Sequence, residues 1–213
     1  MTAPIPEAFV KWAYEGRAEM VRRLASGEQV PHEKVFLSFT RHNPTVISYG
    51  SAGLNGSIKG VGWLPKEAFL QETLDAYLAH IGSGWSDAYS NAGLQLLVSR
   101  LYGEDCHERI DFGRLGSLEL AKDHSWINFR ENPQATLVFY QPPAVSYEVR
   151  GRVEIHEEGS IYHKLINAQH DTYHQPHVER WPERPAYVFR IEEIFDNSAS
   201  PKGFGRKIHP PTE

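Results

Sequence analysis

Hydrophobic and polar residues alternate without interruption from Val145 to His156. Odd-numbered positions in this stretch are apolar or glycine, and even-numbered positions are polar. Successive side chains of a β-strand point to opposite faces, so the pattern predicts one long strand. Gly151 lies at its middle, where a strand of a small barrel can bend. The polar face of the predicted strand includes Ser146 and Glu148.

Other segments have the apolar or β-branched character of shorter strands. The expected strands are residues 34–39, 45–49, 57–63, 109–112, 135–140 and 186–195. The continuous apolar run at 135–140 indicates a strand buried on both faces. Asn55-Gly56 is typical of a type I′ hairpin turn and is expected to connect two of the early strands.

Apolar residues at helical spacing predict five helices. They cover residues 7–25, 66–81, 87–102, 117–132 and 160–172. The second and third follow each other across Gly82-Ser83-Gly84, which predicts a helical hairpin at 66–103. Strands and helices together indicate an α+β protein with a mostly antiparallel sheet.

The composition fits a globular enzyme or binding protein. The chain has 213 residues with 5 Trp, 10 Tyr and 10 Phe, enough for one domain over residues 1–213 with a sizeable core. A net charge of −5 argues against nucleic acid as the main partner. The single cysteine, Cys106, cannot form an intrachain disulfide, which favours a reducing compartment. We find no secretion signal or membrane-length apolar run, and therefore expect a cytoplasmic protein without a membrane partner.

Three motifs occur in a fixed order in the second half of the chain. They are Phe-Gly-Arg-Leu-Gly-Ser at 112–117, Asn-Phe-Arg-Glu-Asn-Pro-Gln-Ala-Thr-Leu at 128–137 and Tyr-Glu-Val-Arg-Gly-Arg-Val-Glu at 147–154. Over residues 109–156 this order resembles the pyridoxamine 5′-phosphate oxidase-like superfamily. The resemblance implies a split β-barrel with flanking helices, in which the hairpin at 66–103 is an insertion. It also implies a homodimer that binds flavin mononucleotide (FMN) at the subunit interface and oxidises or reduces a small-molecule substrate.

The predicted helix start after Gly116 is suited to a phosphate, because free backbone N–H groups and the helix dipole favour an anion. Ser117 is expected to cap this helix, and Arg114 to pair with phosphate oxygens. Family members carry Ser-x-Lys closer to the helix-ending proline, where this chain has Asp123, His124 and Ser125. Either the helix is longer and the phosphate moves toward Arg114 and Ser117, or the ligand is not a flavin phosphate.

The residues expected to contact the cofactor are Arg114, Gly116, Ser117, Lys122, His124, Ser125, Ser146 and Glu148. Lys122 is a substitute for the missing basic residue, and Ser146 and Glu148 share the strand face that in the family meets the flavin ring. No catalytic side chain is assigned, and no metal site is expected, although histidines cluster between His163 and His177. Two alternatives remain open: a haem or deazaflavin in the same cleft, or a non-catalytic dimeric ligand-binding protein.

Overall fold

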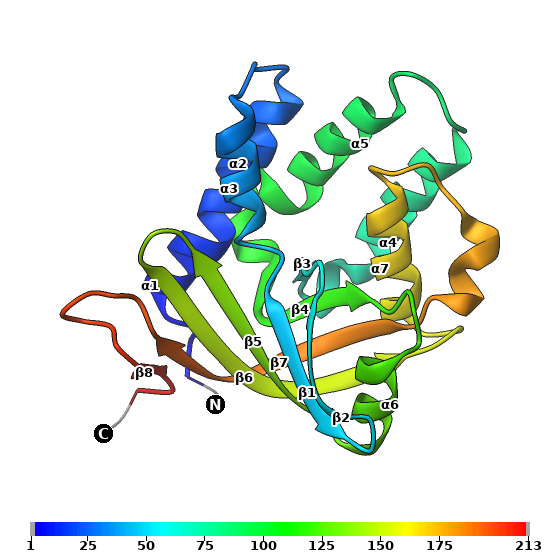
Figure 1. Cartoon of the computed structure of the whole chain (residues 1–213). Coiled ribbons are helices and arrows are strands. Elements are labelled where there is room, and N and C mark those ends of the chain that lie inside the picture. Colours follow the sequence, from blue (N-terminus) through cyan, green and yellow to red (C-terminus); the bar gives the residue numbers. More distant parts are fainter. Residues whose placement is uncertain (1–2, 212–213) are drawn as a thin grey trace.

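The computed structural model describes residues 3–211 and contains one antiparallel sheet (Figure 1). Its eight strands within these residues follow the order β2-β1-β5-β6-β7-β4-β3, with β8 paired to β7. The strands are β1 (Thr45–Gly50), β2 (Gly53–Ile58), β3 (Gly62–Pro65), β4 (Ile110–Leu118), β5 (Gln134–Gln141), β6 (Val145–His156), β7 (Ala186–Asp196) and β8 (Arg206–His209). The predictions at 45–49, 135–140, 145–156 and 186–195 are confirmed.

The sheet curls round a large apolar core, and a second apolar cluster lies where α4 and α7 pack beside it. Val46 of β1 and Trp63 of β3 come from distant parts of the strand order and are buried in the same cluster. The segment between β2 and β3 completes the turn of the sheet, since the Val61 N–H donates to the carbonyl of His42 at 2.8 Å. This arrangement confirms the predicted α+β split barrel.

Gly151 lies at a bulge between β6 and β7. Arg150 pairs with Glu193 and Gly151 with Ile191, so Glu192 is an extra residue on β7. A Cβ atom at Gly151 would lie 1.8 Å from the carbonyl oxygen of Arg190. Only glycine therefore permits this close approach, and it lets the long strand bend as the sequence predicts.

Most helices lie on one side of the sheet (Figure 1). They are α1 (Glu7–Val10), the π-helical turn at Lys11–Glu15, α2 (Gly16–Ala25), α3 (His32–Phe39), α4 (Leu70–Gly82), α5 (Tyr89–Leu97), α6 (His124–Glu131) and α7 (Ile161–Asp171), with short helical turns at Glu67–Phe69, Val98–Tyr102, Glu104–Arg109 and Val178–Glu183. Helix α6 is separate from the others and packs against β1 and β2 at the opposite end. No helix in residues 3–211 is long and apolar enough to cross a membrane.

Helices α4 and α5 come from the segment between β3 and β4, which pair directly with each other. Both helices contact α7. The hydroxyl of Tyr89 donates to the carbonyl of Asp171 at 2.7 Å, and a Cβ atom at Gly93 would lie 1.9 Å from the carbonyl of Thr172. The segment at 66–103 thus holds α7 in place beside the sheet.

Three local predictions in the first half of the chain are wrong. Residues 57–63 do not form one strand, because β2 ends at Ile58 and β3 begins only at Gly62. Residues 34–39 form most of α3 rather than a strand, because a short apolar run fits both structures and Pro31 precedes the first helical turn. Asn55 and Gly56 lie inside β2, and the hairpin turns at Ser51-Ala52. Gly53 has a φ of 83°, which supplies the left-handed backbone of that turn.

Candidate functional site

The segment between β4 and α6 differs from the sequence prediction of a helix over 117–132. Residues up to Leu118 continue β4, and α6 begins only at His124. Ser117 pairs with Tyr187 of β7, so hydrogen bonds within the sheet override the helical propensity of the following residues. Gly116 and Ser117 are therefore strand residues, and the prediction that Ser117 caps a phosphate-binding helix is wrong.

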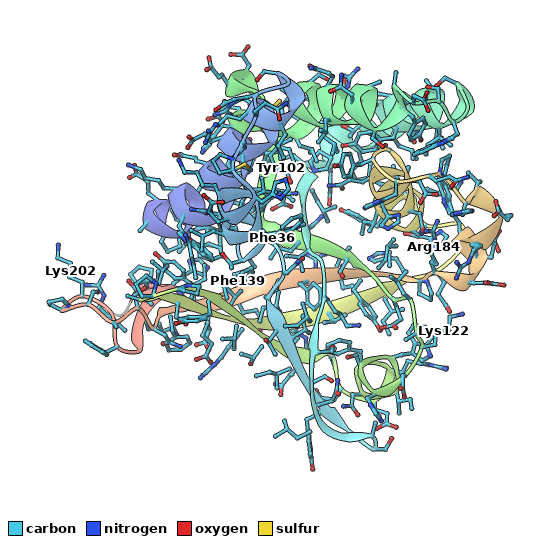
Figure 2. The ribbon with its side chains drawn as sticks, turned by 45° about the horizontal axis from the view of Figure 1, so that its top comes forward. Phe36, Tyr102, Lys122, Phe139, Arg184 and Lys202 are labelled. Carbon is cyan, nitrogen blue, oxygen red and sulfur yellow. The ribbon has the colours of Figure 1, made fainter. Side chains whose placement is uncertain are left out.

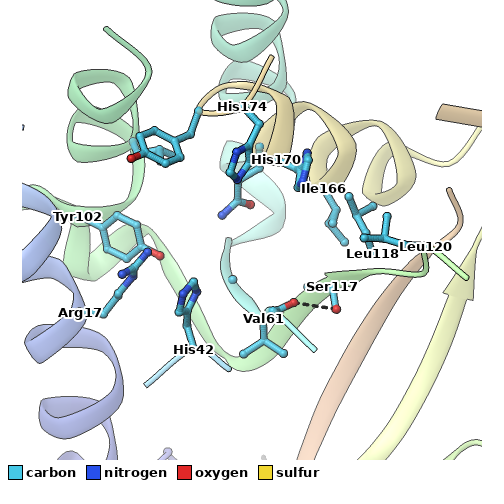
Figure 3. Close-up of a pocket in the computed structure, with 16 residues that line it drawn as sticks. Arg17, His42, Val61, Tyr102, Ser117, Leu118, Leu120, Ile166, His170 and His174 are labelled. Atoms are coloured by element: carbon cyan, nitrogen blue, oxygen red, sulfur yellow. Dashed lines mark hydrogen bonds between the residues drawn. The ribbon is translucent and has the colours of Figure 1, made fainter. Parts of the chain in front are cut away.

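A pocket of about 350 Å³ lies beside the adjoining ends of β3 and β4 (Figure 3). We call it the large pocket. Its floor is the backbone of residues 60–62 and 116–118, where the Ser117 hydroxyl donates to the carbonyl of Gly60 at 2.8 Å. Helix α7 and the turn after it form one wall with Ile166, His170 and His174. The opposite wall contains Arg17, His42 and Tyr102.

His170 is held by the buried carboxylate of Asp171, 2.9 Å from its Nδ1. Burial would raise the pKa of Asp171, but hydrogen bonds from His170, Arg184 and Trp181 hold that pKa well below its ordinary value. An ionised carboxylate cannot donate, so His170 Nδ1–H is the donor. His170 also lines the large pocket.

A second pocket of about 210 Å³, here called the small pocket, lies at the start of α6. It is lined by Asn55, Ser57, Lys59, Glu119, Ala121, Asp123, His124 and Ser125. The Ser125 hydroxyl is buried and accepts a hydrogen bond from the Asn55 amide at 3.0 Å. These donors and hydroxyls provide a polar site next to the helix N-terminus.

Glu119 dominates the electrostatics of the small pocket. Its carboxylate accepts from Lys59 Nζ at 2.9 Å, from the N–H groups of Ala121 and Lys122 at 2.8 Å and from the Tyr187 hydroxyl at 2.8 Å. Burial would raise the pKa of Glu119, but the hydrogen bonds from Lys59, Ala121 and Tyr187 together lower it. The Lys59 charge is thus neutralised from within the chain.

The two pockets lie along the same pair of segments. The large pocket takes residues 60–62 and Leu118 and Leu120, whereas the small pocket takes Lys59, Glu119 and Ala121. Neighbouring residues of each segment therefore face different pockets.

The predicted cofactor residues are distributed over several places. Gly116 and Ser117 line the large pocket, and His124 and Ser125 line the small one. Lys122 lies at the surface near α6, with Nζ 5.9 Å from the centre of the Trp126 ring (Figure 2).

Arg114 is not available to a phosphate. It bonds to the Tyr162 hydroxyl and lies 3.3 Å from the Asp111 carboxylate and 3.5 Å from Glu67. Its charge is therefore balanced by neighbouring side chains on the α7 side of β4. The predicted phosphate pairing of Arg114 has no support in this geometry.

Ser146 and Glu148 lie on the outer face of the sheet and line neither the large nor the small pocket. Register pairing places Tyr140 opposite Ser146, and the same face continues to Tyr49, Leu54 and Ile58. Leu54 is 77% exposed and Ile58 66%. This outer face is therefore apolar over β1 and β2 and polar over β6.

The histidine cluster is divided between different surroundings. The rings of His170 and His174 lie 4.6 Å apart at the large pocket, but His163 bonds to the carbonyl of Trp181 and His177 lies near Glu179. In the described part of the chain, no group of three or more His, Cys, Asp or Glu side chains could hold a metal ion.

Arg17, His42, Lys59 and Glu119 were missed by the sequence analysis. Lys59 and Glu119 each follow the last residue of a strand, and opposite charges at two strand ends are a signal that could have indicated their pairing. Arg17 lies on α2 and His42 in the turn after α3, and no periodicity connects them.

Comparisons with known proteins were made for the whole chain. No family model and no curated protein matches it. Among solved structures, HupZ of Group A Streptococcus is 15% identical, with a TM-score of 0.45 over 84% of this chain and 98% of that one. Proteins named as pyridoxamine 5′-phosphate oxidases from Lactobacillus delbrueckii (16% identical, TM-score 0.42, 78% and 93% covered) and Listeria innocua (12%, 0.43, 78% and 98%) are also similar.

Proposed function

We propose that this protein is a flavin-dependent oxidoreductase acting on a small molecule. The observation that carries the proposal is the pair of pockets along residues 59–62 and 116–121. A flavin has a flat ring, which matches the large pocket, and a chain ending in phosphate in FMN, to which the small pocket offers polar groups. The bound flavin would supply the electron transfer, and the protein its position and electrostatics.

The residues of the large pocket suit a ring. Residues 60, 62 and 116 are glycines, so a ring can lie directly on the backbone at the floor of the pocket. Apolar side chains such as Val61 and Ile166 surround it. His170 presents Nε2 at the wall and can accept or donate a proton there.

The small pocket suits a polyol chain better than a phosphate. Asn55, Ser57 and Ser125 provide hydroxyl and amide groups. Its formal charges are one positive, on Lys59, and two negative, on Glu119 and Asp123. Phosphate binding is strong where positive charge is unpaired, and here the ammonium is already bonded to Glu119. We therefore expect FMN to bind no more than about tenfold more tightly than riboflavin, a difference of about 1.4 kcal/mol.

Flavin titration tests the proposal. Purified protein is titrated with FMN and riboflavin while flavin fluorescence and visible absorbance are recorded. Gly60 lines the large pocket, so Gly60→Val should narrow the pocket and weaken the binding of both flavins. The fold should tolerate the change, because a Cβ at Gly60 meets no atom closer than 3.7 Å. Gly82→Val, at a position with no neighbour within 4 Å, is the control. Absence of flavin binding to the wild type would refute the proposal.

The same titrations discriminate the alternative cofactors. A deazaflavin would compete with FMN for the large pocket. Haem would instead give a Soret band that His170→Gln or His174→Gln removes, since these two histidines line the pocket.

We further propose a homodimer that uses the outer sheet face as its interface. Tyr49, Leu54, Ile58 and Tyr140 are each more than half exposed on neighbouring strands, and burial of such an apolar face favours association. A second copy would also cover Ser146 and Glu148. Analytical ultracentrifugation should give a dimer for the wild type and a monomer for Leu54→Asp. Val178→Asp, on the exposed turn after α7, is the control.

A further inference from the structure

The large pocket has a cationic wall without a counter-ion. Its lining includes Arg17, His42, His170 and His174 but no Asp or Glu side chain. Within residues 3–211, no carboxylate lies within ion-pair distance of Arg17. The whole chain carries 27 acidic and 22 basic residues, so a pocket of this composition differs from the rest of the molecule.

Arg17 is held at this wall by its neighbours. It lies on α2 with its guanidinium 5.7 Å from the centre of the Phe39 ring and next to Tyr102 (Figure 3). Burial raises the pKa of Tyr102, and the adjacent Arg17 partly opposes that effect. The Nε atom of Arg17 is buried and has no hydrogen-bond partner. The guanidinium also lines the large pocket, where its other N–H groups can donate to a ligand oxygen.

His42 adds a second polar atom of the same kind. Its Nε2 is buried and makes no hydrogen bond. Burial, with the repulsion of Arg17, lowers the pKa of His42 to about 3, so the ring is neutral near pH 7. The wall thus offers one full positive charge, on Arg17, next to a neutral imidazole. A guanidinium without a counter-ion matches an anion with a single charge and two oxygens.

We propose that the large pocket binds the carboxylate of a small, mainly apolar organic acid through Arg17. The body of the acid would contact Leu97 and the ring of Tyr102. The proposal that an acid binds here depends only on the pocket. The proposal that this acid is the substrate rests on the proposed flavin function, with the acid held against the flavin ring.

Benzoate and benzamide are a matched pair of probes, since they have nearly the same shape and differ in charge. Their affinities are measured by isothermal titration calorimetry on the full chain after flavin removal. The wild type should bind benzoate at least about tenfold more tightly than benzamide, the difference typical of a hydrogen bond to a charged group. Arg17→Gln should remove that preference and leave benzamide binding unchanged.

Arg23→Gln is the control, because Arg23 lies on the same helix in an exposed pair with Glu28. It should keep the wild-type preference. Equal affinities of the wild type for both probes would overturn the proposal, even if Arg17→Gln did not fold. Retention of benzoate affinity in folded Arg17→Gln would overturn it as well.

Failure of the flavin proposal is visible separately. If the protein binds benzoate but no added flavin, the acid-site proposal stands and the flavin proposal is refuted. If it binds flavin but does not distinguish benzoate from benzamide, only the acid-site proposal is refuted.

Discussion

Acidification should destabilise this protein through His42, and the size of the effect follows from its burial. The pKa of His42 falls from 6.5 in the unfolded chain to about 3 in the folded one, because burial and Arg17 disfavour the charged ring. Between these values the unfolded state binds more protons, so stability is lost as the pH falls below about 6.5. Lowering the pH from 7 to 5 should therefore cost about 2 kcal/mol through this residue alone.

Urea unfolding followed by tryptophan fluorescence at pH 7 and pH 5 measures this loss. The variant His42→Gln cannot titrate, so its loss between the two pH values should be smaller than that of the wild type by about 2 kcal/mol. Other groups contribute equally to both proteins and cancel in the comparison. His124→Gln, which changes an exposed histidine, is the control. If wild type and His42→Gln lose the same free energy, His42 is not a buried neutral ring and the reasoning is wrong.

Three other changes have defined outcomes. Glu119→Gln frees the Lys59 ammonium from its carboxylate, so flavin titration should show a rise in the affinity for FMN relative to riboflavin; an unchanged ratio would mean that no phosphate reaches Lys59. Gly151→Ala forces a Cβ atom against the carbonyl of Arg190 and should cost about 1–3 kcal/mol or more in urea unfolding, whereas a neutral result would exclude the close approach. His170→Gln should lower turnover with an identified substrate by about 10²-fold or more without weakening flavin binding, and equal loss of both would assign His170 to binding.

The strands of the second half were predictable because their burial is regular. Val145–His156 has one face in the core and the other outside, so alternation in the sequence records the geometry directly. Gly151 could be placed as a bend for the same reason. Strand order and closure of the barrel depend on distant pairings, such as Val61 with His42, which no local pattern contains.

The start of α6 was not predictable from local preference. Residues 117–123 favour a helix by composition, yet Ser117 and Leu118 pair with β7 and the Glu119 N–H donates to the carbonyl of Pro185. Lys122 then adopts a left-handed backbone with φ 52°, which separates strand from helix. Tertiary hydrogen bonds determine the conformation of this segment. The helix N-terminus on which the predicted phosphate site depended therefore lies at His124 and not at Ser117.

The two pockets differ in whether a side chain of this protein neutralises their positive charge. In the small pocket Glu119 supplies the negative charge that Lys59 and two backbone N–H groups bind, so an incoming phosphate must compete with a carboxylate fixed in place. In the large pocket no Asp or Glu of the described residues lines the wall to supply a negative charge to Arg17. Arg17 is partly buried, and a ligand that brings the missing charge gains a charge-assisted hydrogen bond with it. The anionic group that this protein recognises most strongly is therefore expected at Arg17 rather than at the amino end of α6.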